Sequence, residues 1–415
     1  MIKHILKIVW EQRRSNLLIW MELLLVTVFL WMVMDQLYGF YKLYKVPKGF
    51  NIENTYMVDI QMIPGRELSG NASTDSLQKA YEEPFYAILE KIRHNANVEY
   101  ASASVMSRPY NGSNTWSMVN LEDKKKKNRK SQSYLRRVEL DFFKVFRIPI
   151  AYGKSLSGVG NGEIVLSKAI ADSLFKANAD AIGKQCSING EKFTIVGVTS
   201  TYKYYDFSEE TPTSYQQFAP SFKESLGSVY TPEICIRLKT NAPSDAAEKL
   251  QKELANIIDS PYYIREIIPF DRLKDTYFTW TGEVKTMKMS AAIIIFFLIN
   301  VLLGIVGTFW FRTEQRKNEI GLRMAIGSSA RSLRGYFLKE SLLLMVLAAL
   351  PAALIALQLR FFDIQLFKYW NGSWVVFAFA GITAFAILSA MVLLGTWIPV
   401  HKASRIQPSE ALHYE

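Results

Sequence analysis

The stretch Arg312-Thr-Glu-Gln-Arg-Lys-Asn-Glu-Ile-Gly-Leu-Arg-Met-Ala-Ile-Gly327 lies between two long apolar runs and decides how the chain is interpreted. Ile320, Met324 and, less regularly, Ile326 recur near helical spacing, with charged residues between them. Gly327 ends this helix, and either of the two serines after it can cap the next one. The pattern predicts a short helix along the membrane surface. A loop that merely joined two spans would need neither an apolar face nor a glycine stop.

Working outward, four apolar cores are long enough for membrane helices, which take about 20 residues each. The cores lie at residues 17–34, 289–311, 342–359 and 374–398, and the transmembrane helices are expected at 17–38, 288–311, 340–360 and 374–398. Bulky residues at positions 31–36 follow the first core, where a signal peptidase needs small side chains. The first span is therefore expected to remain as an anchor.

Lys and Arg residues set the orientation, because short cytoplasmic loops carry an excess of them. Four lie in residues 1–16 and seven in 312–339, but only two lie between the third and fourth spans. Residues 312–339 and both termini are therefore expected in the cytoplasm, with residues 39–287 outside. Residues 1–16 should form an interfacial amphipathic helix, and residues 399–415 a cytoplasmic tail.

The composition agrees with a few spans and a large water-exposed domain. Of 415 residues, 49% are hydrophobic, and the formal net charge is +11. The basic residues cluster beside apolar runs, so membrane lipid is the expected partner of this charge and nucleic acid is not.

The exported region alternates strand-like and helix-like segments. Two strand-helix-strand units are expected to combine in one α+β layer, and their segments are residues 56–63, 83–94 and 98–106, then 233–238, 244–258 and 262–268. Residues 107–230 read as an insertion that forms an outer lobe, in which Asn189-Gly190 signals a tight hairpin. The fold class is thus an α-helical four-span module with an α+β extracytoplasmic domain of two lobes.

No catalytic motif is apparent. Gly153-Lys154-Ser155 is the only such triplet, but Ile148 stands where a phosphate-binding loop needs a glycine. No histidine pair has metal-ligand spacing, and we expect no catalytic, cofactor or metal site. Cys186 and Cys235 lie in apolar strand-like segments, which favours buried free thiols over a disulfide bridge.

Two features inside the spans invite a functional interpretation. Glu22 is the only acid in the four apolar cores, and it is either an anchor near the cytoplasmic end, stabilised by Arg13 or Arg14, or a participant in dimer movement. Alanines repeat every four residues from Ala348 to Ala356 in the third span, a pattern that serves close helix packing within one subunit or between two.

Three blocks of the exported region carry a family resemblance: Asp141–Gly153, Glu163–Phe175 and Ile182–Val198. In order and spacing they resemble the periplasmic core of MacB-type ABC transporter permeases. The block Glu314–Gly327 and the tail Pro399–Leu412 are similar to the FtsX-like permease module of the same superfamily.

This resemblance implies a multi-pass protein of the bacterial inner membrane that works as a homodimer or related heterodimer with cytoplasmic ABC ATPase subunits. ATP and Mg would be bound by the partner ATPase, and none by this chain. A periplasmic adaptor or an outer-membrane channel would be a further partner. The coupling residues would be Glu314, Arg316, Glu319, Ile320, Gly321, Arg323, Met324 and Gly327.

Three function classes follow. The first is a mechanotransmitting permease that exports or extracts a substrate from the periplasmic side. The second is an FtsX-like signalling subunit that controls a periplasmic enzyme or sensor without transport. The third, a membrane-anchored enzyme or adhesion module, would leave the charged loop without a purpose, although a solvated loop that only obeys the positive-inside rule is the simpler alternative for that segment.

Overall fold

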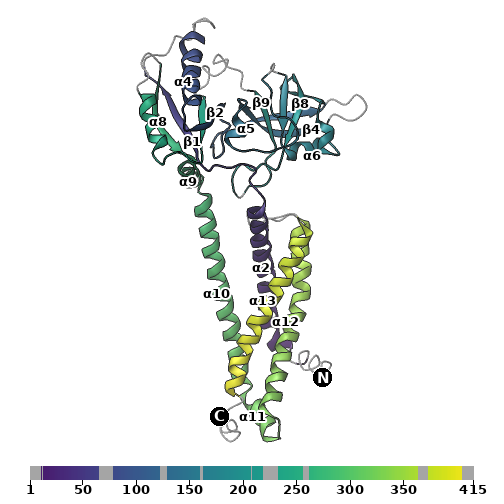
Figure 1. Cartoon of the computed structure of the whole chain (residues 1–415). Helices are drawn as coiled ribbons and strands as arrows, with labels where there is room; N and C mark the ends of the chain where they lie inside the picture. Colours follow the sequence, from purple (N-terminus) through teal and green to yellow (C-terminus); the bar gives the residue numbers. More distant parts are fainter. Residues whose placement is uncertain are drawn as a thin grey trace. The chain divides into compact units, whose positions relative to one another are not determined.

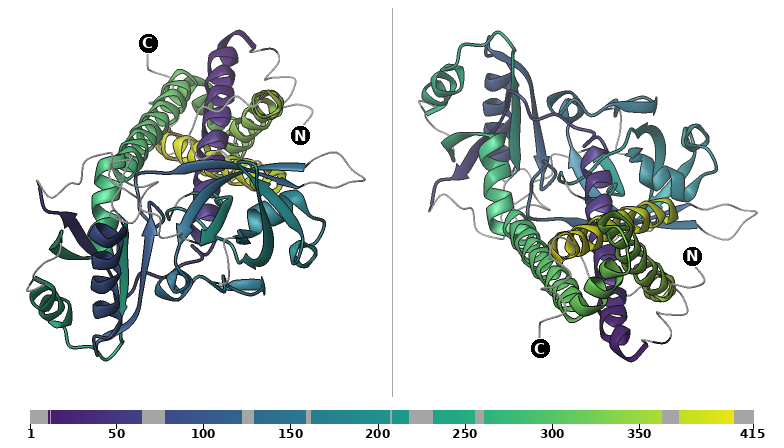
Figure 2. Two further views of the ribbon diagram at one scale, coloured as in Figure 1. Left: turned by 90° about the horizontal axis from the view of Figure 1, so that it is seen from above. Right: turned by 90° about the horizontal axis from the view of Figure 1, so that it is seen from below.

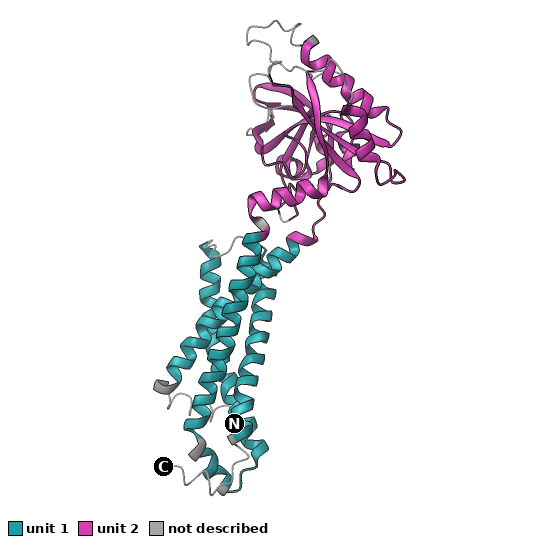
Figure 3. Ribbon diagram, turned by 90° about the vertical axis from the view of Figure 1, so that its left-hand side faces the viewer, with its two compact units in different colours: residues 1–42, 285–415 teal, residues 43–284 magenta. Residues whose placement is uncertain are grey.

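The structure, a computed structural model, describes residues 11, 13–64, 78–121, 129–158, 162–206, 208–217, 232–255, 261–362 and 373–403. The chain forms two compact units (Figure 1 and Figure 3). We call residues 1–42 with 285–415 the helical unit and residues 43–284 the sheet unit.

Four long helices dominate the helical unit, and each is long and apolar enough to cross a membrane. They are α2 (Arg13–Lys45), α10 (Glu283–Gln315), α12 (Ala330–Phe361) and α13 (Trp374–Ala403). All four apolar cores expected from the sequence lie in these helices, but each helix extends beyond its core, and α13 continues through Pro399. The expected interfacial helix lies largely outside the described residues, as does the tail beyond residue 403.

Apolar side chains from all four helices meet inside this unit. Leu30, Ile305, Met345 and Leu388 are almost fully buried together. The alanine repeat of α12 also faces inward, since Ala348, Ala352 and Ala356 are all buried. The repeat therefore packs within one subunit, one of the two alternatives that the sequence left open.

In the sheet unit, the strand order begins β11-β1-β10-β2, with all neighbours antiparallel. These strands are β1 (Thr55–Met62), β2 (Val98–Val105), β10 (Glu233–Leu238) and β11 (Tyr262–Pro269). Helices α4 (Glu83–Arg93) and α8 (Ala246–Ala255) lie beside these strands (Figure 2). Their apolar faces are buried in one core with the strands. The two predicted strand-helix-strand units are confirmed.

The sheet continues from β2 into β4 (Arg129–Val138), β3 (Thr115–Leu121), β7 (Gln185–Ile188), β8 (Glu191–Thr199), β6 (Glu163–Leu166) and β9 (Thr213–Gln217). The short β5 (Ile150–Gly153) pairs with β8. Asn189 and Gly190 join β7 to β8 with φ of 52° and 90°, the positive values that a primed hairpin turn requires. The predicted hairpin is therefore present.

The remaining helices of the sheet unit are short. They are α5 (Phe142–Val145), α6 (Lys168–Leu174) and α9 (Phe270–Thr281). Single turns lie at Gln78–Glu82 and Asn178–Ala181. Phe142, Phe146 and Phe270 form part of a second core, which is rich in aromatic rings.

A buried guanidinium joins three segments of the sheet unit. Arg237 of β10 is 1% exposed, and it donates to the carbonyls of Val145, Glu53 and Asn51 at 2.6, 2.6 and 2.7 Å. No carboxylate takes part in these three bonds. Burial lowers the pKa of Arg237 to about 10, so the group stays charged at neutral pH.

Both cysteines are free and buried, as predicted. Burial raises the pKa of Cys186 to about 12. Both thiols are therefore protonated and unreactive near neutral pH.

Candidate functional site

The charged stretch between α10 and α12 contains one short helix, α11 (Lys317–Ala325). The predicted single helix from Glu314 to Gly327 is wrong in one respect, because Glu314 belongs to α10 and the backbone turns at Arg316, with φ −102° and ψ 11°. Helices this short are marginal in water without tertiary contacts. The side chains around α11 therefore decide how it is held.

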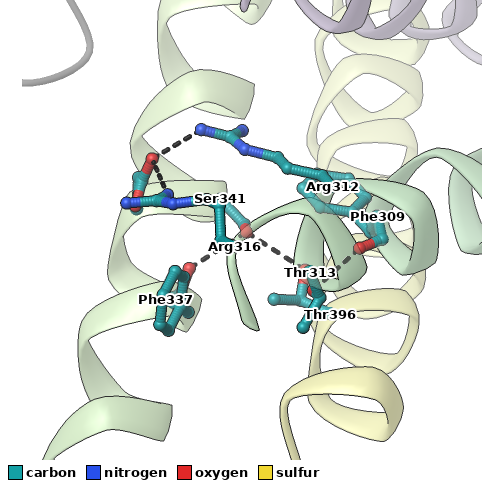
Figure 4. Close-up of a pocket in the computed structure, with 8 residues that line it drawn as sticks. Phe309, Arg312, Thr313, Arg316, Phe337, Ser341 and Thr396 are labelled. Carbon is teal, nitrogen blue, oxygen red and sulfur yellow. Dashed lines mark hydrogen bonds and ion pairs between the residues drawn. The ribbon is translucent and has the colours of Figure 1, made fainter. Parts of the chain in front are cut away.

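Arg316 connects α11 to α12. Its Nε donates to Glu319 Oε2 at 2.7 Å. Its Nη1 lies 3.0 and 2.9 Å from the two oxygens of Glu340 (Figure 4). The same guanidinium lies over the Phe337 ring, 4.7 Å from its centre. Arg316 is thus a buried connector between α11 and α12, and its role in ATPase coupling stays a prediction.

Glu340 is the acceptor that unites this cluster, and it was missed by the sequence interpretation. It is 1% exposed, and Arg312 of α10 donates to its Oε1 at 2.5 Å. The surrounding pocket is lined by Phe309, Arg312, Thr313, Arg316, Phe337, Glu340, Ser341 and Thr396 (Figure 4). The only signal for Glu340 in the sequence was its place between an arginine-rich loop and the apolar core of the third span.

Glu319 lies between two arginines. Its carboxylate pairs with Arg316 and, at 2.6 Å, with Arg323. Burial alone would raise the pKa of Glu319, but the hydrogen bonds and charges of these arginines outweigh it and hold the pKa below its ordinary value. Glu319 is therefore ionised at neutral pH and paired with both arginines.

The apolar face of α11 packs inside its own unit. Ile320 is 2% exposed in a cluster with Leu333, Phe337 and Val400, and Met324 packs against this cluster. Gly321 is buried as well. These three predicted coupling residues hold α11 in place and do not lie on its exposed face.

The opposite face of α11 is exposed and partly apolar. Leu322 is 51% and Ile326 is 77% exposed. Arg323 lies between the two faces, with its guanidinium 4.7 Å from the centre of the Tyr336 ring. Leu322, which was not among the predicted site residues, and Ile326 thus make up the apolar exposed face.

Gly327 ends α11 as predicted. Its φ is +99°, and two bonds close the end of the helix: the Gly327 N–H donates to the Met324 carbonyl at 3.0 Å, and the Ser328 N–H to that of Arg323 at 2.9 Å. Ser329 then caps α12, because its hydroxyl accepts from the Ser332 N–H at 3.3 Å. The turn between α11 and α12 is thus fixed by its backbone.

Glu22 of α2 faces α10. The hydroxyl of Thr308 donates to Glu22 Oε2 at 3.1 Å, and Gly304 leaves space for the carboxylate. The expected partners Arg13 and Arg14 have side chains outside the described part. Glu22 is also not the only acid in the spans, because the longer helices include Asp35 and Glu340.

The described residues contain no group of three side chains suited to a metal ion. Gly153-Lys154-Ser155 begins at the last residue of strand β5, with no helix of the described part directly after it. This geometry differs from the strand-loop-helix arrangement of a phosphate-binding loop.

Family models match both units of the chain. The model for the MacB-like periplasmic core domain matches residues 42–254, and the model for the FtsX-like permease C-terminal module matches residues 291–408. The chain belongs to the MacB/FtsX-like family of ABC transporter permeases. Its four apolar helices and MacB-like domain identify an inner-membrane permease with a periplasmic domain. The α11 site of this permease lies wholly within the FtsX-like match.

Named relatives are larger proteins. The permease is 26% identical over 286 residues to a probable syringafactin export ATP-binding/permease protein of Pseudomonas syringae pv. tomato, covering 67% of this chain and 42% of the relative. It is 25% identical over 252 residues to a macrolide export ATP-binding/permease protein of Burkholderia lata, covering 60% of this chain and 35% of the relative. The permease thus spans about two fifths of the length of such relatives.

The periplasmic region of MacB from Actinobacillus actinomycetemcomitans is a solved structure with some similarity to this chain. The match has 17% sequence identity and a TM-score of 0.36. It covers 57% of this chain and 97% of the solved chain.

Proposed function

We propose that this chain is the permease subunit of an ABC transporter that uses ATP hydrolysis by a separate cytoplasmic ATPase to move its periplasmic domain, and so exports a substrate from the periplasmic side. The printed names of its relatives, which are export ATP-binding/permease proteins, support an export role. A second copy of the chain or a related permease would complete the assembly.

The observation that carries the proposal is the division of α11 into two faces. One face is fixed to the helical unit by Ile320 and Arg316, while Leu322 and Ile326 remain exposed on the other. Exposed apolar side chains on a short, firmly held helix suit insertion into a groove of another protein. Loops that only connect spans have no need of such an arrangement.

The test is the double substitution Leu322→Asp with Ile326→Asp, in the chain co-expressed with an ABC ATPase subunit from the same organism. Losing the burial of two apolar side chains should cost about 3 kcal/mol of binding, or roughly a hundredfold in Kd. The measurement is the ratio of ATPase to permease after purification in mild detergent. Met118→Asp is the matched control, because Met118 is 45% exposed but lies on β3 of the periplasmic domain.

ATPase recovery at the wild-type ratio from the double variant would contradict the proposed docking face. The signalling alternative shares this face, so the same complex reconstituted in vesicles separates the two functions. Export predicts ATP-dependent movement of a substrate. Signalling predicts ATP-dependent activation of a periplasmic enzyme or sensor with no movement.

A further inference from the structure

We infer that Glu340 is the positioning residue that joins the coupling helix α11 and the end of α10 to the third span. This inference rests on the proposed function, since it describes how a displacement of α11 by an ATPase would reach the membrane helices. Glu340 itself does not touch the proposed docking face, because its side chain is 2% exposed.

Two independent arms converge on this carboxylate. Arg312 reaches it from the last turn of α10, and Arg316 reaches it from the corner between α10 and α11. Both arginines precede the glycine turn at Gly327 in the chain, whereas Glu340 follows it. The ion pairs therefore bypass that turn and tie its two sides together.

The cluster is too buried to be an ordinary surface ion pair. The side chains of Arg312 and Arg316 are 13% and 11% exposed, and two of their nitrogens, Arg312 Nη1 and Arg316 Nη2, have no hydrogen-bond partner among the described residues. Removing the one carboxylate between them would leave two cations facing each other with poor access to water. The two arginines would then separate, and α11 would lose its fixed angle to α12.

The apolar contacts allow this loss without detaching α11. Ile320 stays packed against Leu333 and Phe337, which do not depend on the charge of Glu340. Removal of the charge should therefore loosen α11 while its exposed face remains present. The variant should therefore still bind the ATPase but stimulate its hydrolysis less. A general folding defect would reduce both binding and stimulation.

The experiment is Glu340→Gln in the full chain with the same ABC ATPase subunit, compared with Lys339→Gln. Lys339 is the exposed neighbour on the same helix, and its substitution removes one charge without touching the cluster. We expect Glu340→Gln to bind the ATPase at the wild-type ratio but to stimulate its ATP hydrolysis about tenfold less, within the usual range for coupling between two sites. Lys339→Gln should match the wild type in both measurements.

Wild-type stimulation by Glu340→Gln would overturn the inference. Loss of ATPase binding by a folded Glu340→Gln variant would overturn it too, because the cluster would then belong to the docking surface. If the wild-type chain neither binds nor stimulates the ATPase, the proposed function itself fails.

If Glu340→Gln does not accumulate in the membrane, a second variant tests the same inference. Arg316→Cys with Glu340→Cys removes both charges, and a short bifunctional thiol reagent then restores the link between the α10–α11 corner and α12. Cys186 and Cys235 are buried and protected from the reagent. Recovery of stimulated hydrolysis after cross-linking supports a positioning role, and a cross-linked, folded variant that remains unstimulated overturns it.

Discussion

At the scale of single residues, Asp206 shows how one carboxylate fastens distant segments of the periplasmic domain. It accepts from the Tyr110 hydroxyl at 2.8 Å, and it pairs with Lys48 at 2.7 Å and with Lys274 of α9 at 3.6 Å. Burial opposes the charge of Asp206, but these partners prevail and hold its pKa below the ordinary 3.8. Its contribution to stability is therefore complete above pH 3.8 and is lost as the pH falls through the lower, folded-state pKa.

Asp206→Asn is expected to destabilise the permease by about 1–2 kcal/mol near neutral pH, because a charged acceptor becomes a neutral one. The measurement is the midpoint of denaturant unfolding across a pH series. The difference from the wild type should shrink in acid below pH 3.8. A difference that stayed constant throughout would show that the charge of Asp206 is not what stabilises the domain.

Glu22 yields a prediction at the same scale. A glutamine can still accept the hydrogen bond from Thr308, so Glu22→Gln should leave ATPase stimulation unchanged within about twofold. Thr308→Val removes the donor and should lower stability by roughly 0.6 kcal/mol, as is typical of hydrogen bonds between membrane helices. Reduced stimulation by a normally expressed Glu22→Gln variant would favour its role in dimer movement.

At the scale of elements, the end of α11 depends on one backbone conformation. An added Cβ at Gly327 would meet nothing within 4 Å, so any penalty comes from its φ of +99° alone. Gly327→Ala should cost about 1–2 kcal/mol of local stability, and Gly327→Asn less, because asparagine tolerates positive φ better. Faster amide exchange across α11 in Gly327→Ala than in Gly327→Asn is the expected measurement, and the reverse order would refute the argument.

The same element shows where sequence reasoning reaches its limit. The spacing of Ile320 and Met324 predicted a helix with one apolar face, and the structure contains one. The spacing could not reveal that this face packs against Leu333 and Val400, because those side chains come from other helices. A helix face that binds a partner and a helix face that packs in the core have the same apolar spacing in a sequence. Leu322 was therefore not predicted as a site residue.

At the scale of the whole molecule, the four apolar cores and the period of the strands were enough to predict the helical and sheet architecture. The buried charges were not predictable in this way. Glu340 and Asp35 lie just outside the apolar cores, and only the longer helices of the structure bring these acids into the bundle, where each is 1% exposed. Their burial depends on which arginines or neighbouring helices fold against them, and that information is spread over the chain.

The three backbone carbonyls that hold Arg237 determine how its hydrogen bonds respond to acid. In acid, a carboxylate partner of this guanidinium would eventually be protonated and lose its charge. Amide carbonyls do not titrate, and acid only keeps a guanidinium charged. The bonds from Arg237 to Val145, Glu53 and Asn51 should therefore persist at a pH low enough to protonate Asp206 and release its contacts.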